Sequence, residues 1–212
     1  MKVGVFTDSR SEYSHLYHLM KEIQKHKELE LKTIVTGMHL LEKYGYSKKI
    51  IEQDGFQIDY EIEMLEYDYN TSFMTEVSGR IISALGKIFQ EGEINLLVVL
   101  GDRFETLAAV TAAFLSNIPV AHIAGGDLSG NIDDSIRHAI TKLSHIHFCL
   151  TEKSAERVRM LGEEEWRIHT IGSPSLDYIF SKDGLLSEKD IREKYGLEDK
   201  FYLLVVQHPE TG

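Results

Sequence analysis

The segment Leu96–Leu100 reads LLVVL and contains no polar residue. A strand that is apolar at every position has to be covered on both faces, which is typical of a central strand in a parallel sheet. Successive parallel strands are joined by helices that pack on the sheet. This one segment therefore predicts an α/β fold in which helices cover both faces of a mostly parallel sheet.

The flanking sequence alternates between strand-like and helix-like segments, as such a fold requires. Strands are predicted at 2–7, 29–36, 56–64, 96–100, 119–123, 146–150 and 167–171. Helices are predicted around 13–23, over 38–54 as a whole or broken helix, and at 73–91, 105–117, 132–145, 152–161 and 186–195. In the first of them, apolar residues at 13, 16, 20 and 23 have the spacing of one buried stripe. This order predicts a doubly wound sheet.

Charge and composition exclude several classes of partner. The chain has 34 acidic and 23 basic residues, a net charge of −11, which disfavours nucleic acid and anionic membranes. The single cysteine, Cys149, rules out an internal disulfide and suits a reducing, cytoplasmic location. No apolar run reaches transmembrane length. We find no HExxH motif and no Cys/His cluster, so no metal site is predicted.

The polar turns of the chain all follow predicted strands. In a doubly wound sheet, ligands bind outside the carboxyl ends of the strands. That edge would collect residues 7–10, 101–105, 122–134 and 172–175. The sequence therefore predicts one ligand site along this edge.

Two of these turns allow both a structural and a functional interpretation. After the first strand, Ser9 and Ser11 can cap a helix, and Arg10 suits a phosphate at that helix N-terminus. After the central strand, Asp102 can be a helix N-cap with Glu105 completing a capping box. Partial burial of Asp102 at a strand end would instead tune it for acid–base chemistry.

The segment from residue 122 to residue 138 is the richest in candidate chemistry. Four of the residues from 125 to 131 are Gly or Asn, which permits unusual backbone angles and a close approach of ligand. The pairs Asp133–Arg137 and Asp134–His138 have i,i+4 spacing and share helix faces. These pairs predict either surface salt bridges or carboxylates and a cation that face a pocket.

The C-terminal segment suggests a second domain. Residues 201–206 read FYLLVV, an apolar, strand-like run, and the chain ends soon after it. A buried strand is normally followed by the rest of its sheet. We therefore expect one complete domain over residues 1–198 and the first strand of another over residues 199–212.

A family resemblance is carried by motifs in a fixed order. These are SRSEY near residue 10, VTGMHL at 35–40, GDRFE at 101–105, HIAGGDLSGNIDDSIRHAITKLSHIH at 122–147, IGSPSLD at 171–177 and QHPET at 207–211. They resemble the hydrolysing UDP-N-acetylglucosamine 2-epimerases of sialic-acid biosynthesis over essentially the whole chain. The resemblance implies a Rossmann-like domain that is the N-terminal half of a glycosyltransferase-B type architecture.

The resemblance also implies an activity. Members convert UDP-N-acetylglucosamine and water to N-acetylmannosamine and UDP through a 2-acetamidoglucal, with no metal or redox cofactor. The UDP-sugar would be the small-molecule partner, and the complete protein would form a homodimer or homotetramer. Because half of the cleft would be missing, we expect the 212-residue chain alone to be inactive.

The roles of individual residues follow from the same resemblance. Asp102 and Asp133 match family carboxylates, and Arg137 lies beside the second. Arg10 and His208 match positions that contact the diphosphate, and His138 is expected to add a polar contact to substrate.

One position departs from the pattern of several relatives. They carry a catalytic Glu where this chain has Ala124, and others carry an acid just after the two glycines, here Asp127. Either Asp127 supplies the carboxylate, or the protein handles a different sugar or is impaired. A UDP-2,4-diacetamido-trideoxyhexose is the alternative substrate, and a non-catalytic sugar-nucleotide-binding module is the alternative function.

Overall fold

The computed structural model describes residues 1–64, 71–181, 186–198 and 200–207. The chain forms two compact units, Met1–Pro174 and Ser175–Gly212, which are described separately. The domain boundary predicted between residues 198 and 199 stays a prediction.

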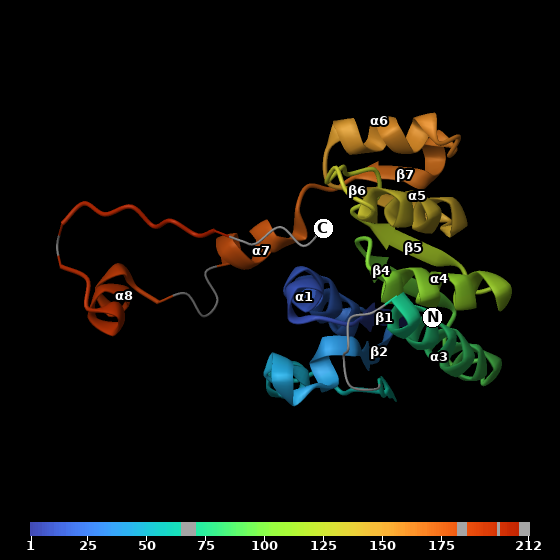
Figure 1. The fold of residues 1–212 in the computed structure, drawn as a ribbon, viewed down its shortest axis with the longest axis horizontal. Coiled ribbons are helices and arrows are strands. Elements are labelled where there is room, and N and C mark those ends of the chain that lie inside the picture. Colours follow the sequence, from blue (N-terminus) through green and yellow to red (C-terminus); the bar gives the residue numbers. More distant parts are fainter. Residues whose placement is uncertain (65–70, 182–185, 199, 208–212) are drawn as a thin grey trace. The chain divides into compact units, whose positions relative to one another are not determined.

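The first unit is built on a seven-stranded sheet in which every pair of neighbouring strands is parallel (Figure 1). The strands are β1 (Lys2–Thr7), β2 (Glu30–Thr36), β3 (Tyr60–Ile62), β4 (Leu96–Leu100), β5 (Val120–Ile123), β6 (Ile146–Cys149) and β7 (Ile168–Thr170). Their order is β3-β2-β1-β4-β5-β6-β7. The chain thus runs outward from β1 in one direction, returns, and runs outward from β4 in the other. The switch point between β1 and β4 is where such sheets bind ligands.

Helices cover both faces of this sheet. Those of the first unit are α1 (Arg10–Lys25), α2 (Lys48–Gln53), α3 (Thr71–Gln90), α4 (Phe104–Leu115), α5 (Asp133–Leu143) and α6 (Glu152–Met160), with 3₁₀ turns η1 (Gly37–Leu40), η2 (Glu42–Tyr44) and η3 (Glu165–Arg167). One buried cluster joins α3, α4 and α5 to the sheet, and a second joins α1 and α2 to it. The doubly wound fold predicted from the sequence is confirmed.

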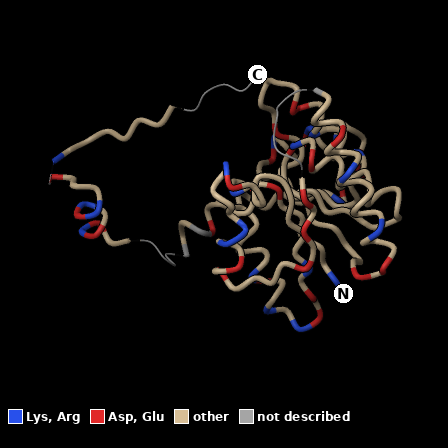
Figure 2. The backbone as a smooth tube through the Cα atoms, turned by 60° about the horizontal axis from the view of Figure 1, so that its bottom comes forward, with Lys and Arg blue, Asp and Glu red and all other residues tan. Residues whose placement is uncertain are grey.

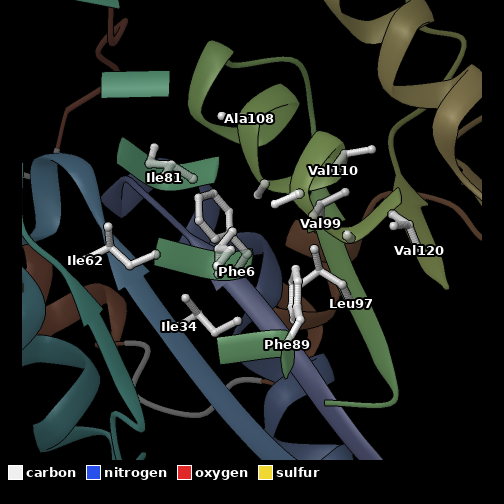
Figure 3. Packing of buried hydrophobic residues seen from close by; sticks show 14 of the residues in the cluster. Phe6, Ile34, Ile62, Ile81, Phe89, Leu97, Val99, Ala108, Val110 and Val120 are labelled. Atoms are coloured by element: carbon white, nitrogen blue, oxygen red, sulfur yellow. The ribbon is translucent and has the colours of Figure 1, made fainter. Parts of the chain in front are cut away.

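The core follows the alternation of side chains along each strand. In β4, Leu97 and Val99 belong to the cluster beneath α3 and α4, whereas Val98 belongs to the cluster beneath α1. Figure 3 shows the first cluster, in which Phe6 of β1 lies among side chains from the neighbouring strands and from α3. Each such fully buried apolar side chain contributes roughly 1.5–3 kcal/mol. The apolar run at residues 96–100 is therefore explained by burial on both faces.

Three predicted segments differ in detail from the structure. The helix predicted over 38–54 is broken into η1, η2 and α2, one of the two forms expected. The strand predicted at 56–64 is reduced to Tyr60–Ile62, which pairs in register with Ile34–Thr36 of β2. The helix predicted from residue 73 begins at Thr71.

The second unit contains most of α7 (Pro174–Ser181) and all of α8 (Glu188–Tyr195). Ser187 caps α8 by accepting the Asp190 N–H at 3.2 Å, and Gly196 ends the helix with φ of +63°. The strand predicted at 201–206 is wrong for this structure: Phe201–Val206 is irregular, and Phe201 is 92% exposed. A strand exists only where its backbone pairs with another, and no described residue supplies that partner.

Charged residues of both signs are spread over the backbone of the first unit, and they alternate along α8 (Figure 2). None of the helices in the described ranges combines the length and the apolar character needed to cross a membrane.

Candidate functional site

Two arginines organise the carboxyl edge of the sheet. Arg137 contacts the side chains of Asp102 and Asp134 and the backbone of Asp127, a set that we call the Arg137 cluster. Arg103 lies with three acids, Asp8, Glu12 and Glu105, which form the Arg103 cluster. Most members of both clusters lie in segments that the sequence predicts at this edge, while Glu12 and Arg137 lie on the helices that follow, α1 and α5.

The Arg137 cluster joins three segments of the chain, one of which, at Asp102, is distant in sequence from the other two. Arg137, buried on α5, donates from Nη1 to Asp134 Oδ1 at 2.7 Å and to the carbonyl oxygen of Asp127 at 2.6 Å. Its Nη2 pairs with Asp102 Oδ2. One guanidinium therefore holds the turn after β4, the glycine-rich loop after β5 and the first turn of α5 together.

Asp102 is not a helix cap. The residue at the N-cap of α4 is Arg103, which makes no side-chain cap hydrogen bond, and Glu105 accepts from Arg103 Nη2 at 2.7 Å. The capping-box interpretation is therefore wrong. Burial raises the pKa of Asp102, while Arg137 opposes the rise and the charge of Asp133 adds to it. A raised pKa makes a carboxyl group a better acceptor of a proton, as acid–base chemistry requires.

His122 fixes the backbone just before Asp102. This buried side chain on β5 lies with Nε2 2.8 Å from the carbonyl oxygen of Gly101, so Nε2 carries the proton and donates it. Burial lowers the pKa of His122 to about 4, so the ring is neutral at pH 7. This role of His122 is not evident from the sequence, although His122 opens the segment that is richest in candidate chemistry.

Asp134 holds the glycine-rich loop in place. Its carboxylate accepts the N–H groups of Ser129 at 2.7 Å and Gly130 at 2.9 Å, and these bonds lower its pKa well below the usual range. The structure replaces the predicted i,i+4 pairs: Arg137 contacts Asp134, three residues earlier. Asp133 instead accepts from Asn131 Nδ2 at 3.1 Å. No described residue forms a hydrogen bond with the buried Nδ1 of His138.

Asp127 and Ala124 lie in the same loop. The carboxylate of half-buried Asp127 accepts a hydrogen bond from Ser154 of α6. Ala124 has a φ of +67°, a left-handed conformation that is unfavourable for residues with a Cβ. The position at which the family pattern departs is therefore also a position of backbone strain.

The Arg103 cluster is more deeply buried. Arg103 Nε lies 2.8 Å from Asp8 Oδ1, and both Asp8 and Glu105 are fully buried. Burial raises the pKa of Asp8 to about 7 against the opposing charge of Arg103, and burial raises the pKa of Glu12 as well. This cluster is not evident from the sequence, because its members come from two distant segments, residues 8–12 and 103–105. The sequence feature that could have indicated the cluster is Arg103, a cation next to Asp102 at the switch point of the sheet.

The remaining predicted residues are placed as follows. Arg10 is the exposed first residue of α1, and Ser9 at the N-cap makes no side-chain cap bond. His208 lies outside the described residues. In the described part of the chain, no three His, Cys, Asp or Glu side chains are grouped as a metal site requires.

A family model matches most of the sequence of this chain. The model described as UDP-N-acetylglucosamine 2-epimerase matches residues 21–212. The chain belongs to the UDP-N-acetylglucosamine 2-epimerase family. The resemblance drawn from the sequence motifs is thereby confirmed.

Individual relatives agree with this assignment. The chain is 38% identical over 210 residues to the UDP-N-acetylglucosamine 2-epimerase of Neisseria meningitidis serogroup B, covering 99% of this chain and 55% of the relative. It is 36% identical over 210 residues to the UDP-N,N'-diacetylbacillosamine 2-epimerase (hydrolyzing) of Legionella pneumophila, covering 98% and 55%. The chain thus spans about half the length of the curated relatives that it matches.

Solved structures of epimerases share the fold. The crystal structure of UDP-GlcNAc 2-epimerase from Neisseria meningitidis bound to UDP-GlcNAc superposes with a TM-score of 0.79 at 22% identity, covering 94% of this chain and 55% of that one. The superposition confirms the predicted fold class, a Rossmann-like unit of the glycosyltransferase-B type.

Proposed function

We propose that the complete protein is a hydrolysing 2-epimerase that converts UDP-N-acetylglucosamine and water to N-acetylmannosamine and UDP. The proton at sugar C2 is removed while the bond from C1 to the UDP oxygen breaks. The electrons of the C2–H bond become the double bond of a 2-acetamidoglucal. Water then adds its hydroxyl group to C1, and a proton returns to C2 on the face that gives the manno sugar.

This chemistry needs a carboxylate near C2, a second acid–base group and cations for the departing diphosphate. The proposal rests mainly on Asp102, whose pKa is raised by burial while Arg137 holds it at the switch-point edge. The carboxylates proposed for proton transfer are Asp102, Asp133 and Asp127. The residues proposed to contact substrate are Arg10, Arg137, His138 and His208.

The proposal includes no metal or redox cofactor, because carboxylates, arginine and histidine can supply proton transfer and charge neutralisation. We also propose that the complete protein forms a homodimer or homotetramer in the cytoplasm. Light scattering during gel filtration of the complete gene product would test the oligomeric state.

The reaction has an isotopic signature. Incubation of the complete gene product with UDP-N-acetylglucosamine in D₂O should release UDP and give N-acetylmannosamine with one deuterium at C2, observed by NMR. Release of UDP with protium retained at C2 would contradict removal of that proton. Binding of the nucleotide sugar without any release of UDP would favour the non-catalytic binding module, the function expected if Ala124 leaves the position of a catalytic Glu without a carboxylate.

A second substrate is favoured by one relative. The Legionella protein is named for UDP-N,N'-diacetylbacillosamine, a UDP-2,4-diacetamido-trideoxyhexose, and it is nearly as similar to this chain as the Neisseria protein. The same carboxylates would serve both sugars. Values of kcat/KM measured for the two UDP-sugars in parallel would decide which is the substrate.

A further inference from the structure

Helix α6 holds the side chain of Asp127 through a chain of hydroxyl groups. Thr151, the N-cap of α6, accepts the N–H of Ser154 at 3.1 Å, and its Oγ1 lies 2.7 Å from Ser154 Oγ. Ser154 Oγ in turn donates to Asp127 Oδ1. A serine hydroxyl has one proton, so the Thr151 hydroxyl donates to Ser154 and the Ser154 hydroxyl donates to the carboxylate.

The backbone beneath Asp127 is held separately. Arg137 Nη1 donates to the carbonyl oxygen of Asp127, and Arg157 Nη1 donates to that of Gly126 at 2.9 Å. Gly126 has a φ of +81°, and a Cβ there would lie 2.2 Å from the carbonyl oxygen of Ser154. Helix α6 therefore packs directly on the loop. With the backbone fixed in this way, the rotamer of Asp127 is the remaining freedom.

Ser154 is 1% exposed and lies in the first turn of α6. The structure gives Asp127 Oδ1 this one donor, and no described residue donates to Oδ2. We infer that Ser154 is a positioning residue that holds the Asp127 carboxylate in one rotamer, with Oδ2 available for proton transfer. The catalytic role of this positioning rests on the proposed function. The contact between Ser154 and Asp127 does not depend on that function. Side chains that act on substrate need such support from the residues behind them.

The kinetic test uses the complete gene product and follows UDP release. Ser154→Ala should lower kcat about 10-fold or more, the order expected for a misplaced acid–base group, and change KM less than about twofold. Ser154→Thr keeps the hydroxyl and should restore most of kcat. The matched control is Ser144→Ala, which removes another buried hydroxyl, one that follows α5 and donates to the carbonyl oxygen of Ile140 in that helix at 2.8 Å. It should leave both constants unchanged.

A double variant shows whether Ser154 acts through Asp127. Ser154→Ala combined with Asp127→Asn should have the same kcat as Asp127→Asn alone, because the group being positioned is already gone. Independent losses that multiply in the double variant would overturn the inference. It would also be overturned by a wild-type kcat in Ser154→Ala, or by equal losses in Ser154→Ala and Ser154→Thr.

A spectroscopic test separates this inference from the proposed function. Three-bond couplings in the NMR spectrum of the 212-residue chain should show one χ1 rotamer for Asp127 in the wild type and averaging between rotamers in Ser154→Ala. Ser144→Ala should keep the single rotamer. If no UDP-sugar reacts but the Asp127 side chain averages between rotamers in Ser154→Ala, the proposed function is wrong. The inference that Ser154 holds Asp127 in one rotamer is then still supported. A single rotamer in Ser154→Ala would overturn the inference whatever the enzyme does.

Discussion

The Arg103 cluster and the Arg137 cluster lie at neighbouring strand ends and have similar composition, yet they differ in solvent exposure. In the Arg103 cluster the carboxyls of Asp8 and Glu105 are fully buried, and burial raises the pKa of Asp8 to about 7. In the Arg137 cluster Asp134 accepts backbone N–H groups, which lower its pKa. Burial and hydrogen bonding thus give opposite protonation behaviour to acids that a sequence cannot distinguish.

The motif at residues 101–105 divides between the two clusters. Asp102 pairs with Arg137, whereas Arg103 pairs with both Asp8 and Glu105. The extended backbone of Arg103, with φ of −73° and ψ of 154°, separates the directions of adjacent side chains. We interpret the Arg103 cluster as an anchor that joins β1 to β4, and the Arg137 cluster as the part that can act on substrate.

The largest expected effect is a loss of kcat when the acids proposed for proton transfer are replaced, compared with no loss when a surface acid is replaced. In the complete gene product, Asp102→Asn and Asp133→Asn should each lower kcat about 100-fold or more, because each removes an acid–base group. UDP release under saturating substrate measures this. Glu165→Gln, which removes an exposed carboxylate paired with Arg159, is the control and should keep wild-type turnover. Wild-type rates in both aspartate variants would show that Asp102 and Asp133 have only a structural role.

The next effect concerns the anchor. Arg103→Met should destabilise the 212-residue chain by about 3–5 kcal/mol at pH 8, because it leaves buried Asp8 and Glu105 without their cation. Urea unfolding followed by circular dichroism measures the loss. Arg159→Met breaks an exposed ion pair and should cost less than about 1 kcal/mol. Equal losses in the two variants would show that the Arg103 cluster is not an anchor.

The protonation of Asp8 gives a third test. Its folded pKa of about 7 lies above the unfolded value of 3.8, so the folded chain binds the proton more tightly and loses stability as pH rises from about 4 to 7. In Asp8→Asn this contribution is absent. The free energy of unfolding of the variant minus that of wild type should therefore rise with pH across this window, by up to about 1.4 kcal/mol per pH unit.

Buried histidines do not obscure this difference. Burial lowers the pKa values of His39 and His122 to about 4, so both favour folding as pH rises from about 4 to 6.5. They are present in wild type and in Asp8→Asn alike, and their effect cancels in the subtraction. Urea titrations at pH 4.5, 6 and 8 give the comparison. A difference that is flat with pH would show that Asp8 is ionised in the folded chain throughout.

The sequence predicted the fold well because the signals for it are local. The apolar run at residues 96–100 and the helical stripe at 13, 16, 20 and 23 depend on periodicity alone, and burial confirms both. The gathering of turns at one edge followed from topology. The pairing of side chains did not follow: helical spacing alone could not show that Arg137 would contact Asp102, 35 residues earlier.

Two other limits have the same origin. The Arg103 cluster was missed because its two segments, residues 8–12 and 103–105, meet only when β1 and β4 become neighbours. The strand predicted at residues 201–206 was wrong here because strand formation needs a partner, whatever the propensity of the segment. Sequence periodicity therefore predicts which side chains of a helix or strand are buried. The tertiary fold determines which side chains from distant segments they contact.

The smallest effect concerns the strain at the start of the glycine-rich loop. Ala124 adopts φ of +67°, which costs a residue with a Cβ about 1–2 kcal/mol. Ala124→Gly removes that cost but increases the entropy of the unfolded chain, so we expect a net stabilisation of roughly 0.5–1 kcal/mol. Ala139→Gly, within α5, is the matched control and should destabilise by about 1 kcal/mol.

Urea unfolding of the 212-residue chain measures both changes under the same conditions. Opposite signs for the two substitutions would place backbone strain in the Arg137 cluster's loop and not in its helix. Strained residues tend to occur at sites that bind or react, because the surrounding contacts must hold them there. If Ala124→Gly destabilised the chain as much as Ala139→Gly, the loop would be relaxed, and the contrast between a strained reactive edge and a well-packed anchor would fail.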